Sequence, residues 1–270
     1  MAKRPQKKFQ GKPLIPKKES QNKTGEHHSL EEPQGMRLNK YIAHSGICSR
    51  RKAAEFIQGG MVEVNGKVVN EIGHRVMDGD EVKFKGKVVK PEVNKVYILL
   101  NKPKDFVTTV SDERGRKTVM DIVGKKIKER IYPVGRLDRA TLGLLLLTND
   151  GDLAKKLSHP SHGVSKVYHI VLDKPVKEEH LKMIRKGLIL EDGPTPVDGV
   201  NYIKNAPKTD VGIEIHIGRN RIVRRIFEHF GYKVKKLDRT IYAGLTKKDL
   251  PRGRFRHLTE KEVIMLKHFT

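Results

Sequence analysis

A run of four leucines followed by a threonine, Leu144–Thr148, constrains the fold more than any other stretch of this sequence. Because polar residues do not alternate with apolar ones, the run predicts a strand buried on both faces. Residues 211–217 alternate strictly, which predicts a strand with one face in the core. Further strands are predicted at 96–101 and 166–172, and helices at 152–157, 178–186, 221–230 and 260–266. Their irregular order favours an α+β fold over a doubly wound sheet.

The preceding part of the chain predicts a small module of two short helices and a hairpin. The helices are expected at 37–44 and 50–58, where apolar residues recur at helical spacing. Ser49 is a suitable N-cap for the second helix. Asn65-Gly66 lies between two short valine-rich runs and suits the type I′ turn of a β-hairpin. Another turn, Asp78-Gly79-Asp80, precedes a further short strand.

These patterns divide the chain into three parts. Residues 1–35 contain four prolines, few apolar residues and no periodicity, so we expect a disordered basic tail. Residues 36–90 form the small module, and a short linker with one proline follows. Residues 96–270 form the larger α+β domain. The tail is either simply solvated or adds contacts to phosphate groups.

The charge of the chain favours a polyanionic partner. Lys and Arg number 56 against 32 acidic residues, a formal net charge of +24, so nucleic acid is the first candidate. No apolar run reaches the roughly 18–20 residues of a membrane span, and the N-terminal residues lack the apolar region of a secretory signal. The single cysteine, Cys48, fits a reducing compartment and excludes a zinc site built on paired cysteines. We expect a cytoplasmic protein with no membrane partner.

A basic turn in the small module is the first candidate binding site. Arg50, Arg51 and Lys52 fall in the first turn of the predicted second helix. The helix dipole disfavours cations there by about 0.3–1 kcal/mol each at low salt, and a bound phosphate would reverse this sign. The alternative is that the three charges are solvated and the fold tolerates them.

The same module carries a family resemblance. Residues 36–43 (MRLNKYIA), 49–54 (SRRKAA) and 62–69 (VEVNGKVV) resemble the RNA-binding module named after ribosomal protein S-four. The resemblance implies binding of structured RNA through the basic turn, with Arg37 and Lys40 as further RNA-binding residues. It identifies no reaction, because this module is attached to many different proteins.

A charged loop that leads into the leucine run is the second candidate site. Asp138 lies between Arg136 and Arg139, and these cations favour the ionised carboxylate that a nucleophile requires. The charges alone favour an ordinary surface ion pair instead. The whole string GRLDRATLGLLLLTNDG, residues 135–151, closely resembles the signature of pseudouridine synthases in the RsuA/RluB branch. In that family the aspartate of Gly-Arg-Leu-Asp is catalytic, which implies that Asp138 is the catalytic residue and that Arg136 supports the loop or contacts phosphate.

Two further segments match the same family. Residues 99–104 (LLNKPK) look like its opening motif, and residues 165–169 (SKVYH) look like the segment that supplies an active-site tyrosine, here Tyr168. The resemblance implies that Tyr168 stacks on the substrate base or accepts a proton. Its position on the apolar side of the predicted strand is equally typical of a buried core aromatic.

Residues 218–231 (GRNRIVRRIFEHFG) are the third candidate. A helical projection places an apolar face opposite Arg221, Arg224 and Arg225, whose mutual repulsion an anion would relieve. Glu228 offers Arg224 and Arg225 a local partner, so a solvated charged face is the alternative. The segment resembles the last core motif of the family, which implies that Arg224 pairs with Asp138 and orients it, and that Arg221 and Arg225 bind RNA.

Taken together, the resemblance implies a stand-alone rRNA pseudouridine synthase with a mainly antiparallel catalytic sheet that carries a basic cleft. It would isomerise a uridine of rRNA with no cofactor and no metal, and the wording of the motifs favours large-subunit rRNA. Because no coiled-coil heptads appear, we expect a monomer. No Gly-x-Gly-x-x-Gly or Gly-x4-Gly-Lys-Ser/Thr string is present. His159 and His162 lack a third ligand nearby and read as loop histidines. The rivals are a non-catalytic RNA-binding ribosome-assembly protein and an rRNA methyltransferase.

Overall fold

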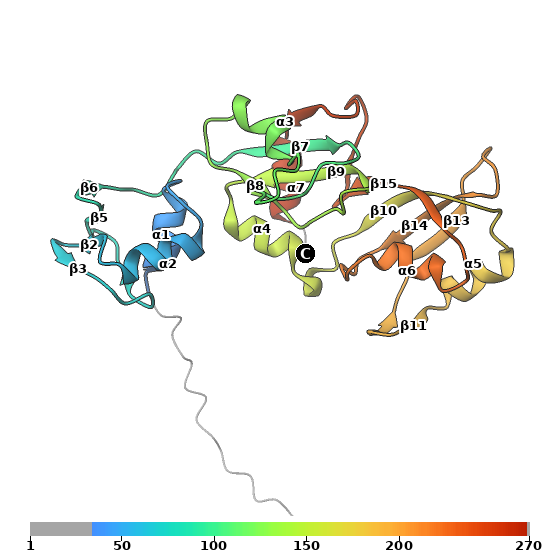
Figure 1. Ribbon diagram of the computed structural model, residues 1–270, viewed down its shortest axis with the longest axis horizontal. Coiled ribbons are helices and arrows are strands. Elements are labelled where there is room, and N and C mark those ends of the chain that lie inside the picture. Colours follow the sequence, from blue (N-terminus) through green and yellow to red (C-terminus); the bar gives the residue numbers. More distant parts are fainter. Residues whose placement is uncertain (1–33, 269–270) are drawn as a thin grey trace, which may run out of the picture.

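The computed structural model describes residues 34–268, so the expected tail, except for its last two residues, lies outside the described residues. The small module occupies one end of the molecule (Figure 1). Its elements are β1 (Met36–Arg37), α1 (Leu38–His44), α2 (Arg50–Gln58), β2 (Val62–Val64), β3 (Lys67–Val68), β4 (Arg75–Val76), β5 (Val82–Phe84) and β6 (Lys87–Val88). Strands β2, β3, β5 and β6 form one sheet in the order β3-β2-β5-β6, and β1 pairs with β4.

The local signals in this module are confirmed. The hydroxyl of Ser49 accepts a hydrogen bond from the Lys52 N–H at 3.2 Å and caps α2. Asn65 and Gly66 both have positive φ, 51° and 75°, as a type I′ turn requires. A buried cluster that includes Leu38 and Ile57 holds the helices on the hairpin.

The module is attached to the larger domain by specific contacts as well as by the chain. Lys40 Nζ lies 2.8 Å from Asp152 Oδ1 in an ion pair between α1 and the larger domain. The Glu92 N–H, within the predicted linker, donates to the His44 carbonyl at 2.7 Å. These contacts place the end of α1 against the larger domain.

The larger domain is built on a nine-stranded sheet, and the α+β class with mainly antiparallel strands is confirmed. Its main path runs β13-β14-β10-β15-β9-β7-β17, and β16 and β8 pair with β15 and β9. The strands are β7 (Tyr97–Lys102), β8 (Tyr132–Pro133), β9 (Leu142–Thr148), β10 (Lys166–Leu172), β13 (Gly199–Tyr202), β14 (Asp210–Ile215), β15 (Val234–Tyr242), β16 (Leu245–Thr246) and β17 (Phe255–His257). A separate hairpin pairs β11 (Leu188–Leu190) with β12 (Gly193–Thr195).

Helices cover both faces of this sheet (Figure 1). They are α3 (Met120–Val123), α4 (Gly151–Ser158), α5 (Glu178–Arg185), α6 (Ile222–Glu228) and α7 (Glu260–Lys267), with 3₁₀ turns η1 (Gly124–Lys126) and η2 (Pro160–His162). The leucines of β9 divide between two cores: Leu145 and Leu147 pack with residues of α3, α5 and α6, whereas Leu144 and Leu146 pack with residues of α4 and α7. This confirms the strand buried on both faces.

Two predicted elements end two residues earlier than expected. The strand expected at 211–217 ends at Ile215, and the helix expected at 221–230 spans only Ile222–Glu228. The long strand β15 was not predicted at all. Its Asp238 and Arg239 are buried, at 2% and 3% exposure, so two charged residues interrupt the apolar pattern by which buried strands are identified.

Candidate active site

The sheet has two halves that meet at one short parallel pair, β15 with β9, while its other neighbouring strands are antiparallel. Only Asp238 with Leu142 and Arg239 with Gly143 are in register there. Gly143 has φ +106°, and a Cβ at this position would lie 2.2 Å from the Arg239 carbonyl oxygen. The close approach of the two halves therefore requires glycine. This parallel pair is the seam between the two halves, and it brings the loop before β9 next to the middle of β15.

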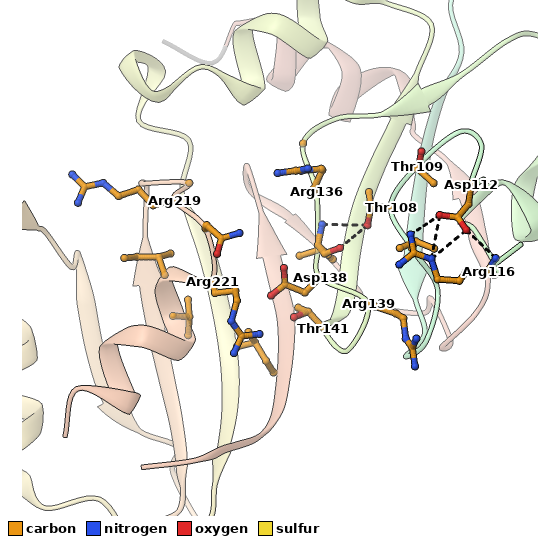
Figure 2. A pocket seen from close by; sticks show the side chains of 18 of the residues that line it. Thr108, Thr109, Asp112, Arg116, Arg136, Asp138, Arg139, Thr141, Arg219 and Arg221 are labelled. Carbon is orange, nitrogen blue, oxygen red and sulfur yellow. Dashed lines mark hydrogen bonds and ion pairs between the residues drawn. The ribbon is translucent and has the colours of Figure 1, made fainter. Parts of the chain in front are cut away.

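A cavity of about 750 Å³ opens at this seam. It is lined by three loop segments, one after β7, one before β9 and one between β14 and α6, together with Tyr168 of β10 and Leu237 of β15. Figure 2 shows Asp138 at its centre, with Arg136 and Arg221 on different sides of it. The predicted catalytic loop and part of the predicted arginine segment are thus brought together, although more than 80 residues separate them in the sequence.

Asp138 is half-buried and sits in a tight turn. The Thr141 N–H donates to the Asp138 carbonyl at 2.9 Å, and β9 begins at the next residue. Its carboxylate points into the cavity (Figure 2). The loop is therefore fixed by the buried strand that follows it.

The two arginines beside Asp138 differ from the simplest expectation. Arg139 points away from the carboxylate (Figure 2), and its Nε contacts Asp105 Oδ1 at 3.3 Å. Arg136 is exposed and lines the cavity. Over residues 34–268, no arginine nitrogen lies within the 4 Å ion-pair distance of the Asp138 carboxylate.

Tyr168 lies both in the core and at the cavity. It is 8% exposed and belongs to the core cluster, and it also lines the cavity. On β10 it lies opposite Ile213 of β14 and Arg239 of β15. A buried ring with one side on the cavity is suited to stacking against a flat ligand.

The Arg-rich segment differs from the prediction. Arg224 is not on a solvated face: it is 8% exposed, and its Nη1 donates to the Val234 carbonyl at 3.1 Å. Burial lowers the pKa of Arg224, repulsion from Arg221 lowers it further, and the Asp138 carboxylate raises it. The predicted pairing with Asp138 is thus an interaction through space rather than a contact, and Arg224 Nε has no hydrogen-bond partner within the described residues.

The other arginines of this segment have different partners from the one expected. Arg225 contacts Asp192 through two nitrogens, at 2.7 and 2.9 Å, and does not line the cavity. Arg221 pairs with Glu228 at 3.3 Å and lines the cavity with φ +46°. Glu228 therefore partners Arg221 rather than Arg224 or Arg225.

Sequence reasoning missed the loop that follows β7. Residues 107–116 contribute Thr108, Asp112, Arg114 and Arg116 to the cavity lining. Asp112 Oδ1 lies 2.6 Å from Arg116 Nη2, and this hydrogen bond, with that from the Arg116 N–H, lowers the pKa of Asp112 to about 2. Arg219 of the β14–α6 segment was missed as well. A glycine within a short charged run, as in DERGR, is the signal that could have drawn attention to the first loop.

The predicted RNA-binding residues of the small module lie mainly on its surface. Arg37, Arg50, Arg51 and Lys52 are exposed, whereas Lys40 is half-buried in its ion pair with the larger domain. Lys52 pairs with Glu55 at 2.6 Å. The described helices include none that is long and apolar enough to cross a membrane. Between residues 34 and 268, no cluster of three or more potential ligands suits a metal ion.

Comparisons with known proteins agree with this geometry. The family model for RNA pseudouridylate synthase matches residues 96–229, and that for the S4 domain matches residues 36–82. The chain is 44% identical over 234 residues to ribosomal large subunit pseudouridine synthase B of Bacillus subtilis, covering 86% of this chain and 95% of the relative. It is 39% identical over 237 residues to the dual-specificity RNA pseudouridine synthase RluF of Escherichia coli K12, covering 86% and 78%.

A solved structure is similar as well. A crystal structure of a pseudouridylate synthase superposes with a TM-score of 0.62 at 28% identity, covering 86% of this chain and all of that one. The match includes both the small module and the larger domain of this chain, because it extends well beyond the residues of either family model alone. The chain belongs to the RNA pseudouridine synthase family.

Proposed function

We propose that this enzyme isomerises a uridine of ribosomal RNA to pseudouridine with Asp138 as its catalytic residue. The carrying observation is the position of Asp138: an acidic side chain at the centre of a cavity whose lining includes Arg136 and Arg221, within the best-matched family motif. The large-subunit relative at 44% identity favours large-subunit rRNA as the substrate.

The proposed reaction breaks the N1–C1′ bond and joins C5 to C1′. The C5 proton leaves and N1 gains one, so the reaction is balanced without an oxidant, a reductant or a group donor, and we propose that no cofactor takes part. Asp138 acts as a nucleophile or as a base on the substrate. A uridine within a helix must leave its stack to reach such a group, so base flipping is expected. The cavity volume of about 750 Å³ is ample for one nucleotide.

The neighbouring side chains have separate proposed roles. Tyr168 stacks on the flipped uracil, because its ring is held by the core and borders the cavity. Arg224 orients the Asp138 carboxylate by electrostatic attraction through space. Arg136 and Arg221, both exposed at the rim, contact phosphates. Arg37, Lys40, Arg50, Arg51, Lys52 and Arg225 bind RNA outside the cavity.

The test is tritium release from rRNA that carries C5-labelled uridine, with large- and small-subunit RNA assayed separately from a strain that lacks the gene. Asp138→Asn keeps the size of the side chain and removes its charge, so single-turnover release should fall by at least about 10³-fold, the scale of losing a covalent catalyst. RNA affinity should stay close to that of the parent. Asp105→Asn is the matched control, because Asp105 is nearby but outside the cavity lining.

Two outcomes would contradict the proposal. Release by Asp138→Asn at close to the parental rate would exclude Asp138 as the catalytic residue. No release by the parent from either rRNA, with binding retained, would favour an RNA-binding ribosome-assembly protein instead.

A further inference from the structure

One hydroxyl group holds the backbone of Leu137, the residue that precedes Asp138. Thr108 Oγ1 donates to the Leu137 carbonyl at 2.8 Å and accepts from the Leu137 N–H at 3.2 Å. Figure 2 shows both hydrogen bonds crossing from the loop after β7 to the loop that carries Asp138. Within residues 34–268, neither Leu137 group has a backbone partner. The threonine side chain therefore does what a neighbouring strand would do.

This contact is closed to solvent. Thr108 is 9% exposed and Leu137 is 6% exposed, and the Leu137 side chain belongs to the main core cluster. Buried N–H and C=O groups that lose their partner are costly, because water does not replace the bond. Without the hydroxyl, the Leu137 peptide must shift until it finds other partners, and Asp138 must move with it.

The peptide on the other side of Asp138 is anchored independently. The Arg139 carbonyl accepts from the Asp105 N–H at 2.9 Å and from Lys102 Nζ at 3.3 Å. The Asp138 carbonyl accepts from the Thr141 N–H. Thr108 thus provides the polar contacts that fix the backbone on the N-terminal side of Asp138. The hydrogen bonds on the C-terminal side are made by other groups and do not replace them.

Thr108 also belongs to the loop that reaches the rim of the cavity. The loop closes at its base, where the Val107 N–H donates to the Lys117 carbonyl at 2.8 Å and the Val119 N–H donates to the Val107 carbonyl at 3.0 Å. Its tip brings Arg114 and Arg116 to the cavity lining. The same closed loop therefore holds the residue before Asp138 through Thr108 at its base and presents cations at its tip.

We propose that Thr108 is a positioning residue for the isomerisation, whose hydroxyl fixes the Leu137–Asp138 peptide and couples the arginine-bearing loop to the catalytic carboxylate. The inference rests on the proposed function of Asp138. In this role Thr108 does not contact the reacting atoms. The Thr108 hydroxyl holds the Asp138 carboxylate in the orientation that the reaction requires. A displacement of a reacting group by about 1 Å can reduce a rate by about 10²-fold.

The experiment compares three variants with the parent at saturating rRNA under single-turnover conditions. Thr108→Val keeps the shape and removes the hydroxyl, Thr108→Ser keeps the hydroxyl and removes a methyl group, and Thr148→Val is the matched control. The Thr148 hydroxyl is buried, donates to the Val96 carbonyl at 2.6 Å and accepts from the Asp150 N–H at 3.0 Å, at the end of β9 remote from Asp138. Thermal melting is measured for each.

The expected result is a split between rate and binding. Thr108→Val should lose about 100-fold in rate with RNA affinity close to parental, and Thr108→Ser should recover most of that rate. Thr148→Val should melt earlier and keep the parental rate at temperatures where it is folded. Equal rate losses in Thr108→Val and Thr148→Val, or a parental rate in folded Thr108→Val, would overturn the proposal.

Asp138→Asn in the same assay separates this inference from the proposed function. If Asp138→Asn is inactive and Thr108→Val is fully active, the role of Thr108 is wrong and the role of Asp138 stands. If Asp138→Asn is active, the proposed function itself fails, whatever the Thr108 variants do.

Discussion

Most of the arginines that line the cavity are held in ion pairs, whereas the two arginines of the basic turn of α2 are not. At the cavity, Arg116 is paired with Asp112, Arg219 with Asp192 and Arg221 with Glu228. In the module, Arg50 and Arg51 are exposed and, over the described residues, neither forms an ion pair. Paired cations have already lost side-chain freedom, whereas unpaired ones can follow whatever phosphate is presented.

The difference separates geometry from affinity. A cavity that must hold one nucleotide in a reactive orientation requires cations fixed before the substrate arrives. A module that docks on structured RNA gains from releasing counterions, which depends on the number of cations and little on their exact placement. Substitutions in the two regions should therefore change different measurements.

The largest effect is expected from Arg224, a buried cation of α6 that follows the cavity-lining Ile222 and Val223. Arg224→Gln removes the charge that interacts with Asp138 through space, so the single-turnover rate should fall by about 10²–10³-fold, the scale of losing a fixed electrostatic group at an active site. RNA affinity should change little, because Arg224 is 8% exposed. Arg225→Gln, one residue along α6, should change affinity more than rate. The opposite ranking would contradict the separation.

This arginine also shows how far sequence reasoning could go. The motif identified Arg224 and Asp138, and periodicity predicted the helix that carries Arg224. The helical projection, however, placed Arg224 on a solvated face. A projection considers one helix in isolation. It therefore does not show that the strand β15 covers that side and that the Val234 carbonyl accepts a hydrogen bond from Arg224.

The same limit applies to the loop after β7. Asn65-Gly66 and Ser49 are local signals, because a turn type or a helix cap depends on the residue and its immediate neighbours. Thr108 has no such signal. Its role depends on Leu137, 29 positions away, and only the pairing of β7 with β9 brings the two loops together.

The next effect is expected in the module. Arg50→Gln with Arg51→Gln removes two unpaired cations, so RNA affinity should fall by at least about tenfold near 0.1 M salt, and the slope of log affinity against log salt should become shallower by about 1.4–1.8. The rate at saturating RNA should stay parental. Lys67→Gln with Lys87→Gln removes the same charge from exposed positions of the hairpins in the same module. Equal changes in both double variants would mean that net charge alone determines binding.

A buried lysine next to the loop that carries Asp138 tests the cost of burying a charge. Lys102 is fully buried, and burial lowers its pKa to about 8. Between pH 8 and 10.5 the unfolded chain binds more protons at Lys102 than the folded one. The contribution of Lys102 to the free energy of unfolding therefore rises with pH, by up to about 1.4 kcal/mol per pH unit. The free energy of unfolding of the parent, measured by urea titration, should therefore rise relative to that of Lys102→Met across this window. Parallel curves would contradict the shift.

The smallest effect is expected at the tip of the loop after β7. There Arg116 can be released from its acidic partner by one variant and left in place by another variant of the same net charge. Asp112→Asn and Glu113→Gln each remove one negative charge, so long-range attraction of RNA increases equally in both. Only Asp112 also holds Arg116 and accepts from the Arg114 and Arg116 N–H groups. Its loss leaves a loop that must be ordered on binding, at a cost of about 0.5–1.5 kcal/mol per side chain. In RNA titrations, Asp112→Asn should therefore bind about three- to tenfold more weakly than Glu113→Gln, whereas equal affinities would show that the pairing of Arg116 adds nothing to binding.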